Sequence, residues 1–298
     1  MEINIYQVDA FTSNSFSGNP AAVVPDAYEL SDSEMQKIAN ELNVSETAFV
    51  SSLDRDLYEV RYFTPMREVE LCGHGTIATF YTLALKGYIK PIYNGIKIVH
   101  QKTKVGKLPV EIKYKDNKVE SIIMEVGTPK KLNDIDDITP ILKAMNIDRL
   151  DVGIGDKFIM PQIISTGLND IMLPIKDKEI LDNLKVNYLD IIDATRDLNV
   201  MGIHAFYLPE KDSSKVYARN FAPIVGINEE AATGTSNGSL IYFLKKNGLI
   251  SQNKITAIQG QSLNRPSEID CYIYNERDGY RIKVGGRAKI VVEGIMNF

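Results

Sequence analysis

The chain contains 298 residues, with 34 lysines and arginines against 39 aspartates and glutamates, and its formal net charge of −5 argues against a nucleic acid partner. Hydrophobic residues make up 44% of the chain and charged residues 24%, which excludes the disordered and fibrous classes and is typical of a soluble protein. This length predicts about two domains, since a typical domain has roughly 150 residues.

The N-terminal residues lack the basic and apolar segments of a secretory signal. The longest apolar stretch, residues 77–85, is far shorter than the roughly 20 residues needed to span a bilayer. We therefore expect a cytoplasmic protein with no membrane partner. The two cysteines, Cys72 and Cys271, have no CxxC partners and are expected to stay reduced. The three histidines lack the spacing of a metal motif, so we expect no dedicated metal site.

Helix and strand signals alternate along the chain. Residues 31–34 form a capping box, which predicts a helix that runs to about Leu42. Two further helices are predicted where apolar residues fill nearly every face ahead of a glycine, a pattern that indicates burial on all sides. Alternation of apolar and polar residues predicts several strands. The two buried helices cover residues 76–86 and 239–247, and the predicted strands cover residues 57–63, 106–114, 215–221 and 281–293.

Several motifs recur in the same order in the two halves of the chain, which indicates an internal duplication. The glycine and proline of residues 18–25 return in residues 167–174. The pattern RxFxP occurs at residues 61–65 and again at 219–223. Each match is weak alone, but their common order carries weight.

The duplication predicts an α+β fold of two similar domains. We expect each domain to hold a curled, mostly antiparallel sheet wrapped around one central helix. The first is expected to span residues 1–116 and to be completed by a C-terminal strand at 285–298, and the second to span residues 117–284.

Both buried helices are expected to begin in glycine-containing loops, at residues 72–75 and 233–238. A helix start exposes unpaired N–H groups and the positive end of the helix dipole, and glycine lets a ligand approach the backbone. If the two domains face each other, both loops line one cleft and can hold a small carboxylate. The simpler alternative is that the glycines only permit tight turns, but their paired occurrence favours binding.

Glu46 is the candidate acid/base. Strand periodicity places it on the same face as Val44, Ala48 and Val50, and burial among such residues raises the pKa of a carboxyl toward the range useful for proton transfer. The alternative is a solvated glutamate on an edge strand. Aligning residues 47–49 with 204–206 puts Ile203 at the corresponding position of the second half, so only one half carries an acid/base here.

The helix-start loops add further candidates. Cys72 corresponds to Thr235, which cannot ionise usefully, and this excludes a symmetric pair of catalytic thiols. His74 can bind a substrate or exchange a proton near neutral pH, although a lone histidine is more often a structural donor. Glu230 can orient the second loop or anchor a substrate amine or hydroxyl. The alternative interpretation is that Glu230 is an exposed acid in a loop.

At these residues the sequence resembles the phenazine-biosynthesis isomerase (PhzF-like) family, whose fold is shared with diaminopimelate epimerase. The resemblance runs nearly end to end. The motifs that carry it lie at residues 8–11, 18–20, 45–49, 61–65, 71–76, 232–234, 259–260, 265–267 and 285–287.

The resemblance implies a diaminopimelate epimerase-like fold, commonly a homodimer, and proton transfer without a cofactor. It implies that Glu46 is the acid/base, in the position that moves a proton between carbons of dihydrohydroxyanthranilate, a cyclic dienyl amino acid. The implied substrate-binding residues are Ser45, Gly73, His74, Gly75, Glu230, Gly234, Thr235 and Ser236, with Cys72 as a possible further site residue.

Three positions depart from the family pattern. Glu230-Ala231 stands where the family usually has Asp-Pro, and Thr235 stands where it usually has serine. These changes reshape the pocket, so the substrate need not be the phenazine intermediate. We expect an isomerase that relocates a proton on a small carboxylate-bearing substrate. The alternatives are an epimerase or racemase of an amino acid-like substrate and a non-catalytic small-molecule binding protein.

Overall fold

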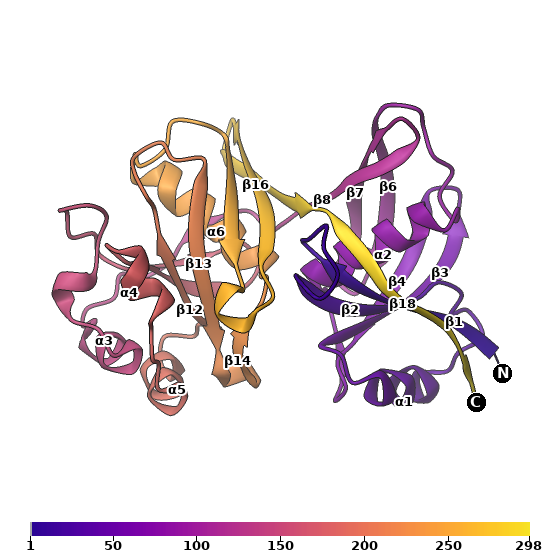
Figure 1. Ribbon diagram of the computed structural model, residues 1–298, viewed down its shortest axis with the longest axis horizontal. Coiled ribbons are helices and arrows are strands. Elements are labelled where there is room, and N and C mark those ends of the chain that lie inside the picture. The colour runs from indigo at the N-terminus through magenta and orange to yellow at the C-terminus, as the bar shows by residue number, and fades with distance from the viewer. Residues whose placement is uncertain (1) are drawn as a thin grey trace. The chain divides into compact units, whose positions relative to one another are not determined.

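The computed structural model describes residues 2–298 and divides the chain into two compact units (Figure 1). The first unit contains the chain up to Glu125 together with Gly285–Phe298, and the second contains Val126–Val284. Among the described residues, no helix is long and apolar enough to cross a membrane. Both units are mixed α+β structures in which strands predominate.

The first unit contains one strongly curled sheet. Its neighbouring strands follow the order β18, β1, β2, β3, β4, β6, β7 and β8, and only the pairs β2–β3 and β4–β6 are parallel. Figure 1 shows helix α2 enclosed by these strands. The elements are β1 (Glu2–Ala10), β2 (Asn19–Val24), α1 (Asp32–Leu42), β3 (Glu46–Asp54), β4 (Leu57–Phe63), β5 (Glu68–Val69), α2 (Gly73–Leu85), β6 (Gly95–Thr103), β7 (Gly106–Lys115), β8 (Lys118–Glu125) and β18 (Ala288–Asn297).

The second unit repeats this pairing scheme. Strands β11 and β12 are parallel, β12 and β13 are antiparallel, and β13 and β15 are parallel. Helix α6 packs against β10, β11, β15 and β16. The elements are β9 (Lys130–Lys131), α3 (Thr139–Met145), η1 (Arg149–Asp151), β10 (Gln162–Ser165), β11 (Asn169–Pro174), α4 (Lys178–Asp182), α5 (Tyr188–Arg196), β12 (Gly202–Tyr207), β13 (Lys215–Ala222), η2 (Pro223–Val225), β14 (Ile227–Glu230), α6 (Gly234–Lys246), β15 (Lys254–Gln259), η3 (Gln261–Leu263), β16 (Ser267–Glu276) and β17 (Gly279–Gly286).

The predicted helices are present, and their local signals explain why. The capping box at the start of α1 is formed, with the Ser31 side chain and the Glu34 side chain each bonded to the other residue's backbone N–H. Helices α2 and α6 are buried on nearly every face, as their apolar sequences predicted. Helix α6 begins at Gly234, earlier than the predicted 239, because the glycine and small polar residues of its first turn are themselves buried in helical conformation.

The single strand predicted at residues 281–293 is wrong. The structure divides this segment into β17, which ends at Gly286, and β18, which begins at Ala288. A side chain at Gly285 would lie 2.5 Å from the carbonyl oxygen of Ile122, so the chain needs glycine to pass close to β8 at this point. Alternation alone does not reveal such a break.

Strand register corrects the counterpart of Glu46. Ala21 lies opposite Glu46 in the parallel pair β2–β3, and Asp170 lies opposite Gly202 in the parallel pair β11–β12. Alignment of residues 18–25 with 167–174 matches Ala21 with Asp170, and therefore matches Glu46 with Gly202 rather than with Ile203. Alignment by residue type alone therefore misplaces the counterpart of Glu46 by one residue, because residue type does not fix strand register. Gly202 has no side chain to transfer a proton.

Candidate active site

The start of helix α2 and the start of strand β3 bring four polar side chains of the first unit together. Cys72 is the N-cap of α2 and His74 lies in its first turn, while Ser45 and Glu46 stand at the start of β3. The segments meet because α2 packs directly on β2 and β3, which pair in parallel. In a parallel pair the N-terminal ends of both strands lie at the same end of the sheet.

His74 lies at the centre of this cluster. Its Nε2 lies 2.7 Å from Oε2 of Glu46 and 3.3 Å from Oγ of Ser45. Its Nδ1 lies 3.2 Å from Nδ2 of Asn19 and 3.6 Å from Sγ of Cys72. The ring is therefore held between groups on three segments of the first unit.

The charges of the cluster are coupled. Burial by itself lowers the pKa of His74, but Cys72 and Glu46 outweigh this effect and raise it well above the ordinary value. Burial by itself raises the pKa of Glu46, but the charged ring of His74, with hydrogen bonding from its neighbours, holds that pKa below the ordinary value. The expectation of a raised pKa for Glu46 is therefore wrong: burial acts in the predicted direction, but the sequence did not show the cation beside the carboxylate, which outweighs it.

The thiol of Cys72 behaves differently. Burial, and then the charge of Glu46, raise the pKa of this thiol, although His74 and the backbone N–H of Gly75 act in the opposite direction. The N–H of Gly75 donates to Sγ of Cys72 at 3.2 Å. The cluster thus contains a carboxylate, an imidazolium and a protonated thiol in contact.

Oε2 of Glu46 is a buried acceptor without a hydrogen bond. It lies close to Nε2 of His74, but no described donor meets hydrogen-bond geometry toward it. We regard this contact as an ion pair by distance only. Such a carboxylate oxygen is available to accept a proton from another molecule.

The same cluster has the composition of a metal site. The Glu46 carboxylate, the Cys72 sulfur and the His74 imidazole each offer a ligand atom, and these atoms lie within 4.8 Å of one another. The sequence spacing predicted no dedicated metal site, because Glu46 comes from a distant segment that no metal motif includes. The fold brings this third potential ligand into place.

In the second unit, Gln259 organises the start of helix α6. Its side chain accepts a hydrogen bond from Nδ2 of Asn237 at 2.8 Å and donates one to the backbone carbonyl of Glu230 at 2.7 Å. The hydroxyl of Thr233, the N-cap residue, donates to Oε2 of Glu230 at 3.1 Å. Gln259 is fully buried, and its hydrogen bonds hold the loop that carries Glu230 in place.

A second layer of buried polar side chains continues from this loop. Oγ of Ser236 donates to Oδ2 of Asp170 at 2.7 Å and accepts from Nδ2 of Asn220 at 3.2 Å. His204 lies 3.2 Å from Asn220 through Nδ1 and 3.2 Å from Asn237 through Nε2. Burial raises the pKa of Asp170 to about 7 and lowers that of His204 to about 4. His204 is therefore neutral, and this layer lacks the ion pair of the first unit.

The site residues predicted from the sequence thus fall into two groups. The first unit brings together Ser45, Glu46, Cys72, Gly73, His74 and Gly75, and the second holds Glu230, Gly234, Thr235 and Ser236 around the start of α6. The side chain of Ser236 is engaged with Asp170 and Asn220. The backbone carbonyl of Thr235 accepts from the hydroxyl of Thr166 at 2.8 Å.

Sequence reasoning missed three residues that shape these groups. Asn19 and Gln259 belong to motifs that carry the family resemblance, and this signal could have identified them. Asp170 had no such signal, because an acid beside an apolar run is normally a turn residue. The folded structure shows that Asp170 is buried, at 3% exposure, and accepts a hydrogen bond from Ser236.

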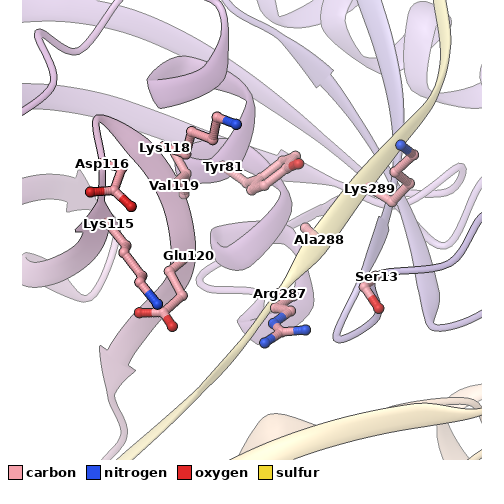
Figure 2. Close-up of a pocket in the computed structure, with 10 residues that line it drawn as sticks. All are labelled: Ser13, Tyr81, Lys115, Asp116, Lys118, Val119, Glu120, Arg287, Ala288 and Lys289. Carbon is pink, nitrogen blue, oxygen red and sulfur yellow. The ribbon is translucent and has the colours of Figure 1, made fainter.

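The hollow in Figure 2 lies elsewhere on the first unit. It has a volume of about 420 Å³ and is lined by the cations Lys115, Lys118, Arg287 and Lys289 with two interspersed acids. It contains none of the predicted site residues. Its lining offers no buried acid/base pair, so the candidate chemistry belongs to the start of α2.

Comparison with known proteins identifies the family of the chain. A family described as phenazine biosynthesis-like protein matches residues 8–294. An uncharacterized isomerase of Clostridium acetobutylicum is 36% identical, over 97% of this chain and 96% of its own. The crystal structure of a PhzF-family phenazine biosynthesis protein of Bacillus anthracis has a TM-score of 0.88 at 27% identity and covers 100% of both chains.

A hydroxyproline epimerase of Agrobacterium vitis shares the fold alone, with a TM-score of 0.64 at 10% identity over 99% of this chain and 91% of that one. The family match spans almost the whole chain, and two relatives matched over 96% and 97% of their own length are named uncharacterized isomerases. The chain therefore belongs to the phenazine biosynthesis-like (PhzF) family and is an isomerase.

Proposed function

We propose that this isomerase moves a proton between carbon atoms of a small, carboxylate-bearing, amino acid-like substrate, with Glu46 as the general acid/base and without a cofactor. The observation that carries the proposal is Oε2 of Glu46, which is buried, lacks a hydrogen bond and lies 2.7 Å from Nε2 of His74. A carboxylate in this state can take a proton from carbon and return it. A cyclic dienyl substrate like that of the family prototype is one candidate.

The proton balance is simple. The substrate C–H bond breaks, its proton forms an O–H bond with Glu46, and the electron pair spreads into the conjugated system of the substrate. Glu46 then returns the proton to a different carbon and regains its charge. His74 favours the charged carboxylate between turnovers, because its own charge lies next to it.

The helix starts are proposed to hold the substrate. The N–H groups around Gly73 and Gly75 on α2, and around Gly234, Thr235 and Ser236 on α6, suit a carboxylate. Glu230 suits a substrate amine. We also propose that the two units derive from a duplication and that residues 285–298 complete the first domain. We also propose a cytoplasmic homodimer.

The test is proton exchange in deuterated water. The purified protein is incubated with a panel of small amino acids and unsaturated carboxylates that includes dihydrohydroxyanthranilate, and deuterium incorporation is followed by NMR and mass spectrometry. We expect a C–H bond of the substrate to exchange and a double bond to move. Glu46→Gln should lower the rate by about 100-fold to 10,000-fold, because the amide cannot carry the proton.

Glu59→Gln is the matched control, since this glutamate pairs with Lys102 at the surface. It should leave exchange unchanged. Full exchange by folded Glu46→Gln would refute the assignment. Exchange with inversion at one carbon would identify an epimerase or racemase, and binding without exchange would identify a binding protein.

A further inference from the structure

The three ligand atoms of the first-unit cluster have distances that suit a tetrahedral metal ion. Zinc bonds of about 2.0–2.3 Å place the ligand atoms of a tetrahedron roughly 3.3–3.6 Å apart. Sγ of Cys72 already lies 3.6 Å from Nδ1 and 3.7 Å from Nε2 of His74. The 2.7 Å between Nε2 of His74 and Oε2 of Glu46 must widen by less than about 1 Å, and all three ligand atoms lie within 4.8 Å of one another.

The surroundings select the ligand atoms. Asn19 contacts Nδ1 of His74, which leaves Nε2 as the nitrogen that faces Glu46. Gly75 donates its N–H to the sulfur of Cys72 at the start of α2, and this contact directs the sulfur toward the cluster. Oε2 of Glu46 is the buried acceptor without a hydrogen bond.

We propose that Glu46, Cys72 and His74 form a binding site for a thiophilic divalent cation such as Zn²⁺, and that this cation inhibits the enzyme. Binding replaces the proton of the thiol, and any proton on Nε2 of the imidazole, which pass to solvent. The three side chains then supply S, N and O ligands, and the fourth position stays open for water or a carboxylate.

Inhibition follows from the shared oxygen. A carboxylate that coordinates the cation through Oε2 no longer offers this lone pair to a proton on carbon. This part of the inference rests on the proposed function of Glu46. The binding part does not, because it depends only on the three ligand atoms and their distances.

Cobalt is the probe for the binding part, because tetrahedral Co²⁺ bound by thiolate gives a near-ultraviolet charge-transfer band and strong visible bands. We expect the full-length, chelator-treated protein to bind one equivalent of Co²⁺ with these bands, and Zn²⁺ to displace it. Cys72→Ser should abolish the charge-transfer band. Glu46→Gln should weaken Co²⁺ binding at least tenfold.

Cys271→Ser is the matched control. Cys271 is the other buried free cysteine of the chain and should not contribute to the band. Melting curves of each variant check that it is folded. Absence of the charge-transfer band in folded wild-type protein at excess Co²⁺ would overturn the proposal, as would its retention in Cys72→Ser.

The two proposals fail separately. If Co²⁺ binds as expected but no carboxylate substrate exchanges its proton, the site stands and the proposed function fails. If exchange occurs and stoichiometric Zn²⁺ leaves it unchanged, the inhibition is refuted. Loss of exchange with Zn²⁺ and its recovery with a chelator would support the whole inference.

Discussion

Asp170 makes the stability of the protein depend on pH in a way that can be calculated. It lies on β11, is 3% exposed, and accepts a hydrogen bond from Ser236. None of the described lysines or arginines forms an ion pair with it. Burial, and to a smaller extent the charge of Glu230, raise its pKa from 3.8 to about 7, although the hydrogen bond from Ser236 lowers it.

The sign follows from proton binding. An unfolded aspartate releases its proton near pH 3.8, whereas folded Asp170 keeps its proton up to about pH 7. Between these values the folded state holds one more proton, so the free energy of unfolding falls as pH rises. At about 1.36 kcal/mol for each pH unit between the two pKa values, the loss reaches about 4 kcal/mol above pH 7.

Asp170→Asn is the perturbation that isolates this effect, because the amide oxygen still accepts from Ser236 but does not titrate. Between about pH 4 and pH 8, we expect wild type to lose about 4 kcal/mol of unfolding free energy relative to the variant. This loss is measured by urea unfolding, with far-ultraviolet circular dichroism as the signal, because the chain has no tryptophan to report unfolding by fluorescence. Exposed Asp156→Asn is the control and should follow wild type. Parallel curves for wild type and Asp170→Asn would refute the reasoning.

Two glycine substitutions test the packing around the strands and the site. In Gly202→Ala the new methyl group would lie 2.0 Å from the carbonyl oxygen of Phe221, so urea unfolding should show a loss of about 1–3 kcal/mol or more, and unchanged stability would contradict the strand register. In Gly75→Ala the methyl group would lie 3.0 Å from the sulfur of Cys72, so both the melting temperature and Co²⁺ affinity should fall. Gly294→Ala meets no atom within 4 Å and should change neither, which makes it the control.

Local sequence signals predicted three of the six α-helices described, α1, α2 and α6, and did not reveal α3, α4 and α5. The capping box at Ser31 predicted the start of α1, and the apolar composition of α2 predicted a helix buried on all sides. These features depend on residues within one or two helical turns, which the sequence places next to each other. The motifs that carry the family resemblance also contain Glu46 and the two helix starts, whose role in binding and proton transfer stays a prediction.

The tertiary structure decided the contacts between distant segments. It put His74 beside Glu46 and so reversed the predicted direction of the Glu46 pKa. It also turned Asp170 into the interior, and strand pairing gave Gly202, not Ile203, as the counterpart of Glu46.

The physical reason is the range of the interactions. Periodicity and capping act over a few residues, and composition limits how many domains can form. The pKa of a buried group and the geometry of a site depend on atoms within a few ångströms that come from different strands and helices. Strand order and register set those distances, and a shift of one residue would turn each side chain to the opposite face of the sheet.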